Sequence, residues 1–220
     1  MDFRKLGHGH TLQRPAFDPE ELTDEAFTFK GEFDDDELLI ESGEFAEVKG
    51  QGTLARSLVR SADLSGVRLS PLELSDVRFE DVELSGASWQ GVKARRTEIV
   101  RSRAMGFRMS LVSANDLYID GCRLDYASIH VESVKGALVF HECTFREATI
   151  SGDLSSVVFS DCSLEGVEFE ATKAVGCDLT TSQIAGASGL LGLRGARISA
   201  EQAASAAILI ATEAGLTVSD

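Results

Sequence analysis

Residues 62–89 read ADLSGVRLSPLELSDVRFEDVELSGASW, and every fifth residue of this stretch, beginning at Leu64, is large and apolar. The spacing runs from Leu54 to Val139, where eighteen consecutive fifth positions are apolar. In a chain that is 43% apolar, such a run arises by chance with a probability on the order of 10⁻⁷. The series resumes at Leu154 and continues to Ile184.

A period of five fits neither the 3.6-residue helix nor the two-residue strand, so the chain has to turn a corner at each repeat. Two residues before each central residue, a second column holds mostly small or β-branched side chains, such as Ala62 and Val67. Two residues after it, where a corner needs a permissive backbone, stand glycines and aspartates such as Gly66 and Asp76. Both apolar columns are predicted to point inward.

These residues resemble the pentapeptide-repeat family, whose motif is a small residue, an Asp or Asn, a central Leu or Phe, and two variable positions. Good matches are Ala62-Asp63-Leu64-Ser65-Gly66 and Cys177-Asp178-Leu179, and the resemblance covers about two thirds of the chain. It implies an all-β fold, a right-handed quadrilateral β-helix with four pentapeptides per coil. This chain departs from the motif by often placing Val in the small column.

The chain is expected to have three parts. Residues 1–50 form an acidic lead segment and N-terminal cap, in which an imperfect coil or edge strand from Leu38 covers the open end of the solenoid. Residues 51–190 form the β-helix of roughly seven coils of twenty residues. Residues 191–220 contain a helix from about Ala200 to Ala214, begun by a capping box of Ser199 and Gln202, and a short final strand at 216–218.

The structural core is predicted from the central column. Trp89 is expected to be buried because alanines in its own coil leave room for a large ring. After Val139 the period breaks, and Phe145 and Ile150 become the better central residues, so the steps are six, five and four residues. Glu132 beside the break is expected to turn outward or to be neutralised. The predicted core residues are Leu64, Leu84, Trp89, Leu124, Phe159, Leu164, Phe169 and Leu179.

The cysteines are interpreted as small thiols that fill a narrow interior. Cys122, Cys143 and Cys162 lie about one coil apart in the inward column, so they should stack near disulfide range. No paired Cys and His spacing typical of zinc is present, and His8 and His10 lack a fixed partner. We therefore expect neither a metal site nor a cofactor.

No sequence motif points to catalysis: a phosphate loop, a dinucleotide fingerprint and a nucleophile elbow are all missing from the sequence. His130 and His141 are expected to face solvent. A regular rod also lacks the deep pocket in which catalysis usually occurs. We therefore expect no catalytic residues and no enzyme, and the remaining alternative of this class is an accessory enzyme that uses Glu132 and His141.

The net charge of −15 invites comparison with pentapeptide-repeat proteins that mimic DNA and bind type II topoisomerases. Residues 1–50 hold 14 acidic and 5 basic side chains, a net charge of −9, whereas residues 51–190 carry only −5. The middle of the rod is basic between Lys93 and Arg108. This layout weakens the analogy, because duplex DNA is uniformly anionic. Direct nucleic-acid binding is disfavoured by the overall charge and by the inward aromatic residues.

The sequence favours a non-enzymatic scaffold that binds another protein through its flat outer faces or its acidic lead, at Asp34, Asp35, Asp36 and Glu37. The C-terminal helix is apolar around most of its circumference, which predicts a homodimer through Ile208, Leu209 and Ile210. The alternative function is a DNA-mimicking modulator of DNA gyrase. A cytoplasmic, non-membrane location is expected, since no apolar run spans a bilayer and the N-terminus has no signal core.

Overall fold

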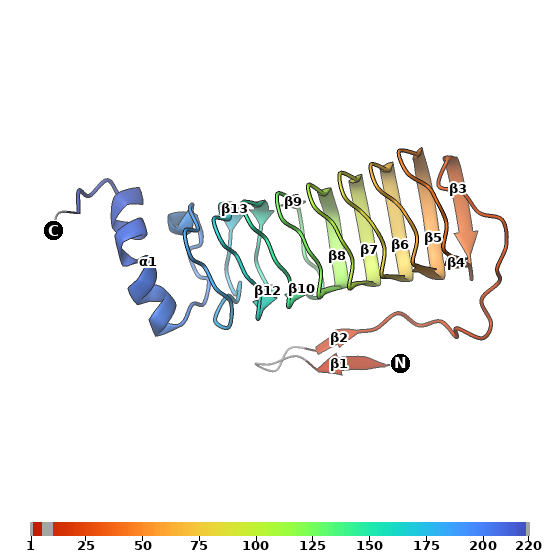
Figure 1. Cartoon of the computed structure of the whole chain (residues 1–220). Helices are drawn as coiled ribbons and strands as arrows, with labels where there is room; N and C mark the ends of the chain where they lie inside the picture. The colour runs from red at the N-terminus through yellow and green to blue at the C-terminus, as the bar shows by residue number, and fades with distance from the viewer. Residues whose placement is uncertain (1, 6–10, 219–220) are drawn as a thin grey trace.

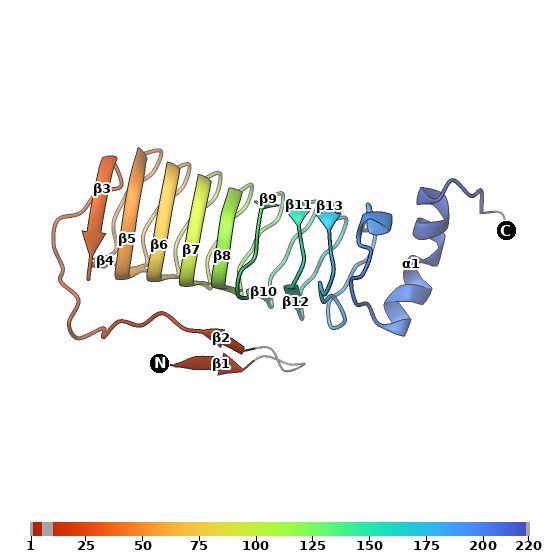
Figure 2. The ribbon, with the colours of Figure 1, turned by 180° about the vertical axis from the view of Figure 1, so that it is seen from behind.

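The computed structural model describes residues 2–5 and 11–218. Parallel strands stack into an elongated solenoid of about seven turns, with one helix beyond its C-terminal end (Figure 1). The N-terminal segment folds back along one side of the stack, as both ribbon views show (Figure 2). Within the described residues, no helix is long and apolar enough to cross a membrane.

The described elements comprise thirteen strands, a single 3-10 turn and a C-terminal helix. Four consecutive strands of 12 or 13 residues, β5 to β8, make the most regular part of the stack. The bounds in chain order are β1 (Phe3–Lys5), β2 (Thr11–Gln13), β3 (Gly31–Asp36), β4 (Leu39–Glu41), β5 (Lys49–Arg60), β6 (Arg68–Glu80), β7 (Ser88–Val100), β8 (Arg108–Asp120), β9 (Ser128–Val131), β10 (Leu138–His141), β11 (Thr149–Asp153), β12 (Val157–Ser160), β13 (Glu168–Lys173), η2 (Leu190–Gly192) and α1 (Ala200–Glu213).

Successive coils pair in parallel at an offset of 20 residues through the middle of the stack. Phe79 lies beside Ile99, and Trp89 lies beside Met109. Each coil therefore contains four pentapeptides, and the all-β solenoid inferred from the repeat is confirmed. The predicted core residues are all buried inside it, with exposed fractions from 0% to 3%: Leu64, Leu84, Trp89, Leu124, Phe159, Leu164, Phe169 and Leu179.

The corners of the coil lie at the last position of the pentapeptide. Gly66 and Gly86 have φ angles of 64° and 67°, and Asp76 and Asp81 have φ angles of 60° and 55°. These are left-handed conformations, which cost roughly 1–2 kcal/mol for most L-residues but suit Gly and are tolerated by Asp. The recurring Gly and Asp of the sequence therefore suit the backbone geometry at the turns, although other corners hold residues such as Arg101 and Tyr126 in the same left-handed conformation.

The break in the period lies one pentapeptide earlier than predicted. Val134 still pairs with Ala114 at an offset of 20, whereas Phe140 pairs with Ile119 at an offset of 21. The extra residue thus enters between Val134 and the start of β10. The offset falls to 19 between β10 and β12, which restores the original spacing.

This earlier break reverses the side on which two neighbouring residues lie. Phe140 is in the core, and Val139 faces outward, contrary to the prediction that Val139 is a central residue. The prediction was wrong because both residues are apolar, so a count of fives cannot distinguish them. Glu132 lies exposed in the turn after β9, which is one of the two outcomes expected for it.

The N-terminal end of the solenoid is closed by aromatic rings. β3 and β4 stack on β5 in the parallel register of the later coils, so the stack begins at Gly31. Phe27, Phe29, Phe33 and Phe45 meet there edge to face, with centroid separations from 4.7 to 6.4 Å. The four rings fill the open end of the first coil.

The C-terminal end is closed by α1. Ser199 and Gln202 form the predicted capping box, and both residues contribute their backbone and side-chain groups to it. The buried Gln202 side chain also donates through Nε2 to the carbonyl oxygens of Leu179 (2.6 Å) and Ser182. The expected strand at 216–218 is wrong: these residues are exposed and irregular, because α1 carries them away from the last coil (Figure 1).

The interior cysteines stack as the sequence indicates. The Sγ atoms of Cys122, Cys143 and Cys162 contact the carbonyl oxygens of equivalent residues one coil earlier, at 3.4 or 3.5 Å. All are buried free thiols, as is Cys177. Burial raises the pKa of Cys143 well above its usual range and raises the pKa of Cys177 to about 12. Cys143 and Cys177 are therefore neutral packing groups, whereas the hydrogen bond with Cys143 lowers the pKa of Cys122.

Replacing Trp89 by Ala is expected to lower the free energy of unfolding by about 3–5 kcal/mol, as large core truncations do. Trp89 is 0% exposed and lies 5.1 Å from the Phe79 ring and 5.3 Å from the Phe107 ring, measured between centroids. Chemical denaturation followed by circular dichroism measures the loss. Trp89→Phe, which keeps a ring in the column, should cost clearly less; equal losses for the two variants would contradict this packing.

Candidate functional site

The N-terminal segment forms a strap against one face of the solenoid. We define the strap as the described residues 2–5 and 11–22. β1 and β2 pair with each other as an antiparallel hairpin that is separate from the main sheet. The hairpin runs beside the middle coils (Figure 2). His8 and His10, considered above as weak metal ligands, lie outside the described residues.

The surface under the strap is one outward column of the coils, which we call the strap face. Its members pair with each other from coil to coil, and the extra residue before β10 brings Val139 into line with them. Most of these outward side chains are buried although they lie outside the solenoid. The strap face consists of Leu58, Arg78, Glu98, Tyr118, Val139 and Val158.

An apolar cluster holds the hairpin on the strap face. Leu12 of β2 is 0% exposed and packs with Tyr118, Val139 and Val158. These residues form a small hydrophobic cluster distinct from the interior of the solenoid. Covering a leucine completely contributes about 1.5–3 kcal/mol relative to leaving it in water. The strap is thus anchored by a hydrophobic contact that the sequence pattern did not reveal.

Glu98 is the charged anchor of the strap. Its side chain is 0% exposed and accepts hydrogen bonds from Arg78 Nη1 of the neighbouring coil (2.8 Å), Arg14 Nε (3.1 Å) and Arg4 Nη2 (3.2 Å). Arg4 also lies over the Tyr118 ring, with its guanidinium carbon 4.0 Å from the ring centroid. The bond to Glu98 raises the pKa of Arg14, although burial opposes it. A buried carboxylate requires such partners.

A second polar contact secures the strap further along. The backbone N–H of Ala16 donates to Asp76 Oδ1 at 2.9 Å, and Arg96 from the next coil donates to both oxygens of Asp76. Burial alone would raise the pKa of Asp76, but the hydrogen bonds from Arg96 and Ala16 lower it below its ordinary value. Asp76 therefore serves as a corner residue and as an acceptor for the strap.

A groove of about 840 Å³ remains between the strap and the coils. Four arginines and six carboxylates line it, together with a few apolar side chains such as Leu58. Because ten of its lining side chains are charged, the groove suits a polar protein segment better than an apolar small molecule.

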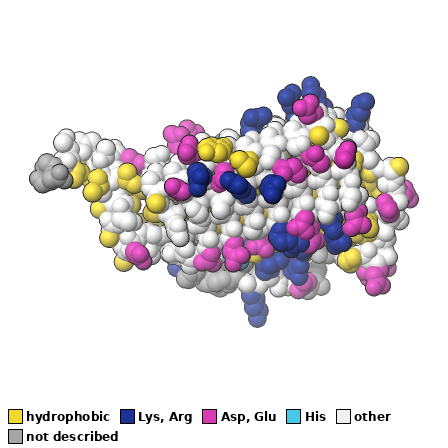
Figure 3. All heavy atoms as spheres, in the orientation of Figure 1, with side chains coloured by type: hydrophobic (Ala, Val, Ile, Leu, Met, Phe, Trp, Pro, Cys, Tyr) yellow, Lys and Arg dark blue, Asp and Glu magenta, His cyan; other side chains and the backbone are white. Residues whose placement is uncertain are grey.

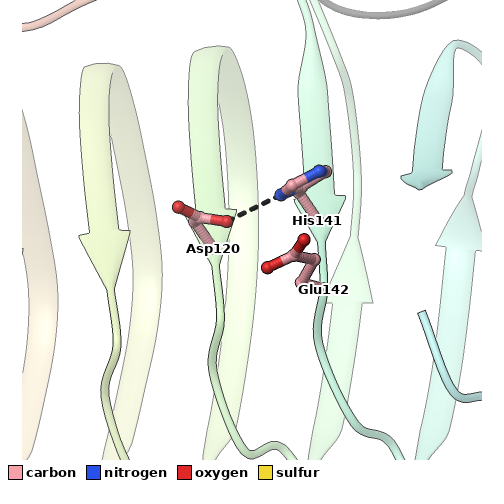
Figure 4. Close-up of side chains that lie close together, drawn as sticks. All are labelled: Asp120, His141 and Glu142. Carbon is pink, nitrogen blue, oxygen red and sulfur yellow. Dashed lines mark hydrogen bonds and ion pairs between the residues drawn. The ribbon is translucent and has the colours of Figure 1, made fainter. Parts of the chain in front are cut away.

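A cluster of possible metal ligands lies at the edge of the strap face. Asp120, His141 and Glu142 point toward one another, and their ligand atoms lie within 4.8 Å (Figure 4). His141 Nδ1 is 2.8 Å from Asp120 Oδ1, and the His141 ring stacks on Tyr118. One imidazole and two carboxylates could hold a divalent cation. Without a cation, His141 has the carboxylates of Asp120 and Asp161 as its neighbours, at 2.8 and 3.9 Å.

The sequence did not reveal this cluster, because the pattern of fives predicted the extra residue one pentapeptide after its actual position. His141 pairs with Asp120 only once the offset becomes 21. His141 is half-buried, with 29% of its side chain exposed, whereas His130 faces solvent as expected. Glu132, paired with His141 in the enzyme alternative, lies in the turn after β9.

The acidic run at the N-terminal edge is only partly free. Asp34 and Asp35 lie on β3, the first strand of the stack. Asp36 and Glu37 both form ion pairs with Arg56 of the next coil. Of the four carboxylates proposed to bind a partner, Asp34 and Asp35 therefore offer the negative charge that is not engaged by Arg56.

On the C-terminal helix the three predicted interface residues point in different directions. Ile208 is 63% exposed, whereas Leu209 is half-buried. Ile210 packs against the interior of the last coil. Ile208, together with the exposed Leu216 and Val218, is therefore the apolar surface of this end that a second molecule could reach.

Opposite charges alternate along the outside of the coils. Lys93 bonds Glu73 (2.6 Å) and Arg101 bonds Asp81 (2.9 Å), each across one coil. Figure 3 shows acidic and basic side chains interspersed over one face of the molecule. The visible face therefore carries mixed charge instead of the continuous acidic surface that a DNA mimic requires.

The identity of the architecture follows from the coil itself: four five-residue segments, an inward central residue in each, and left-handed corners at the last position of the segment. The chain folds as a β-solenoid of five-residue repeats. No protein-family model matches its sequence. No curated protein matches it either.

Two solved structures illustrate the similarity of this pentapeptide-repeat solenoid to known proteins. One is a trypsin-treated form of QnrB1, a plasmid-mediated fluoroquinolone resistance protein, which is 18% identical over 87% of this chain and 99% of that chain, with a TM-score of 0.39. Another is HetL, a pentapeptide repeat protein involved in heterocyst differentiation regulation from the cyanobacterium Nostoc sp. strain PCC 7120, 14% identical over 77% and 89%, with a TM-score of 0.30. At this level of similarity, the two structures do not indicate the function of this chain.

Asp76→Asn is expected to lower the stability of the solenoid at neutral pH by about 1.5–3 kcal/mol, the range for hydrogen bonds to charged groups. Since folding lowers the pKa of Asp76, its contribution is fully present above the ordinary Asp pKa of about 3.9 and is lost as the pH falls from there through the lowered pKa of the folded state. Thermal unfolding at pH 7 and pH 3 should therefore show a large difference between wild type and variant at pH 7 and a smaller one at pH 3.

The matched control for this experiment is Asp161→Asn, at another corner with a φ of 55°. It tests the same chemical change at an exposed residue and should alter stability little at either pH. A pH-independent effect of Asp76→Asn would mean that the Asp76 charge does not contribute.

Proposed function

We propose that this solenoid is a non-enzymatic scaffold for protein–protein interaction. The observation that carries the proposal is the strap face, an outward surface of the coils that already binds an extended protein segment through Leu12, Arg4 and Arg14. The same contacts of apolar and charged side chains make up ordinary protein interfaces. Asp34 and Asp35 on the edge strand β3 offer a second, acidic contact area.

The four buried free cysteines support a reducing, cytoplasmic location for such a scaffold. Cys122, Cys143 and Cys162 stack in one column without forming disulfides. We therefore propose a cytoplasmic location for the scaffold.

We also propose that the scaffold is a homodimer joined by α1. The helix faces the last coil with Gln202, Ala206 and Ile210, and its opposite surface exposes alanines together with Ile208. An exposed apolar helix face at the end of a rod is the kind of surface that a second copy covers. A two-fold contact through this face would leave the strap face of each copy accessible.

Ile208→Asp is expected to convert the dimer to a monomer, because a charge would be buried at the centre of the contact. Light scattering coupled to gel filtration at micromolar concentration measures the mass. Val175→Asp, which introduces the same charge at a 70% exposed residue of the solenoid, should leave the dimer intact. A monomeric wild-type chain would refute the dimer without bearing on the scaffold proposal.

The gyrase alternative predicts that the purified solenoid changes supercoiling by DNA gyrase. We expect no effect, even at a large molar excess, because mixed charge along the coils does not reproduce the phosphate spacing of DNA. Inhibition or stimulation of supercoiling that survives removal of contaminating nuclease would favour the alternative over a general scaffold.

A further inference from the structure

The strap is attached to the solenoid in a way that allows it to leave. Its two strands pair only with each other, and they form a sheet of their own. Among the described residues, the first backbone bond from the N-terminal segment to a coil is Thr23 N–H to the carbonyl of Glu37. Between the hairpin and that point, the contact at Ala16 is made to a side chain. Detaching the strap would thus break no backbone ladder of the coils.

The surface uncovered by such a detachment would be a specific one. Tyr118, Val139 and Val158 form a row of apolar side chains across three successive coils. Glu98 lies one coil away in the same column and would keep Arg78 as its one remaining arginine partner. An apolar row beside a partly compensated carboxylate favours a ligand that brings both an aliphatic group and a cation.

We propose that the strap face is a protein docking site, that its ligand is an extended protein segment in which arginines flank an aliphatic residue, and that the strap is an intramolecular competitor for it. This inference deepens the scaffold function proposed above and rests on it for the existence of a protein partner. The partner's arginines would take the places of Arg4 and Arg14 at Glu98 and Tyr118. Its aliphatic side chain would take the place of Leu12.

The geometry of the strap explains why arginine, more than lysine, is the required cation. Arg4 uses its planar guanidinium twice, bonding Glu98 at 3.2 Å and stacking over the Tyr118 ring at 4.0 Å. A lysine ammonium lacks the planar group that serves both contacts at once. A nucleic acid is excluded as the ligand of this face because Glu98 would repel its phosphates.

Tethering sets the strength of the competition. A segment joined by a short linker competes at an effective concentration in the millimolar range. The strap is joined to β3 by residues 23–30, which form such a short linker. A strap that binds its face with a separate affinity of about 100 μM would then be bound roughly nine-tenths of the time. A free partner would meet the face with an apparent affinity about tenfold weaker than its intrinsic affinity.

The experiment uses the full chain in three forms and a fluorescent synthetic peptide of residues 1–17 as the probe. The opened variant carries Arg4→Ala, Leu12→Asp and Arg14→Ala, which remove the three anchors of the strap. The control variant carries Lys5→Ala and Thr11→Asp, changes at exposed residues of the same hairpin. Fluorescence anisotropy measures peptide binding, and hydrogen exchange at the amides of β2 measures release of the strap.

We expect the peptide to bind the opened variant at least about tenfold more tightly than the wild type or the control variant. Adding Glu98→Gln to the opened variant should weaken peptide binding, as should replacing both peptide arginines by lysine. Because all three changes of the opened variant lie outside the coils, its thermal unfolding temperature should stay near that of the wild type, which verifies that the solenoid is folded.

Three results would overturn the inference. Equal peptide binding to wild type and opened variant would show that the strap does not compete, and the absence of binding to a folded opened variant would show that the face is not a separable site. A lower oligomer mass for the opened variant than for the wild type would show that the strap docks on a second copy. None of these results depends on a cellular partner, so each is distinct from a failure of the scaffold proposal.

Discussion

Parallel backbone pairing at an offset of 20 residues is the constraint on which the structure depends. Each residue is held beside the equivalent residue of the next coil. Inward side chains of neighbouring coils must therefore pack together in one interior, and outward side chains of neighbouring coils must be compatible in charge. Trp89 packs directly against the Phe79 and Phe107 rings inside the coils. Arg78 and Glu98 meet outside the same coils for the same reason. The pairing thus determines both the core and the chemistry of the faces.

The sequence predicted the parts of the fold that repeat. The period of five located the core and the corners because each coil imposes the same requirement on its central residue and on its last position. The prediction failed where two candidates satisfied the rule equally, at Val139 and Phe140. That single ambiguity hid the register of His141 with Asp120, and with it the cluster of possible metal ligands.

The strap could not be predicted from the sequence for a different reason. Its charged contacts join residues 84 and 94 positions apart, from Arg14 and Arg4 to Glu98, and each of them is made between two side chains. Such contacts leave no periodic signal, and an isolated Glu among arginines is typical of any solvated surface. Of the site residues, Glu98 and Arg78 were detectable in principle, since opposite charges exactly one coil apart are expected to pair.

A parallel stack of coils has no inherent limit to its growth, because the backbone of each terminal coil offers the same unpaired groups as the coil before it. At one terminus the Gln202 amide donates hydrogen bonds to the carbonyl oxygens of Leu179 and Ser182, and at the other terminus phenylalanine rings cover the first coil. Covering both ends in this way opposes head-to-tail growth of the stack into filaments and favours a particle of fixed length.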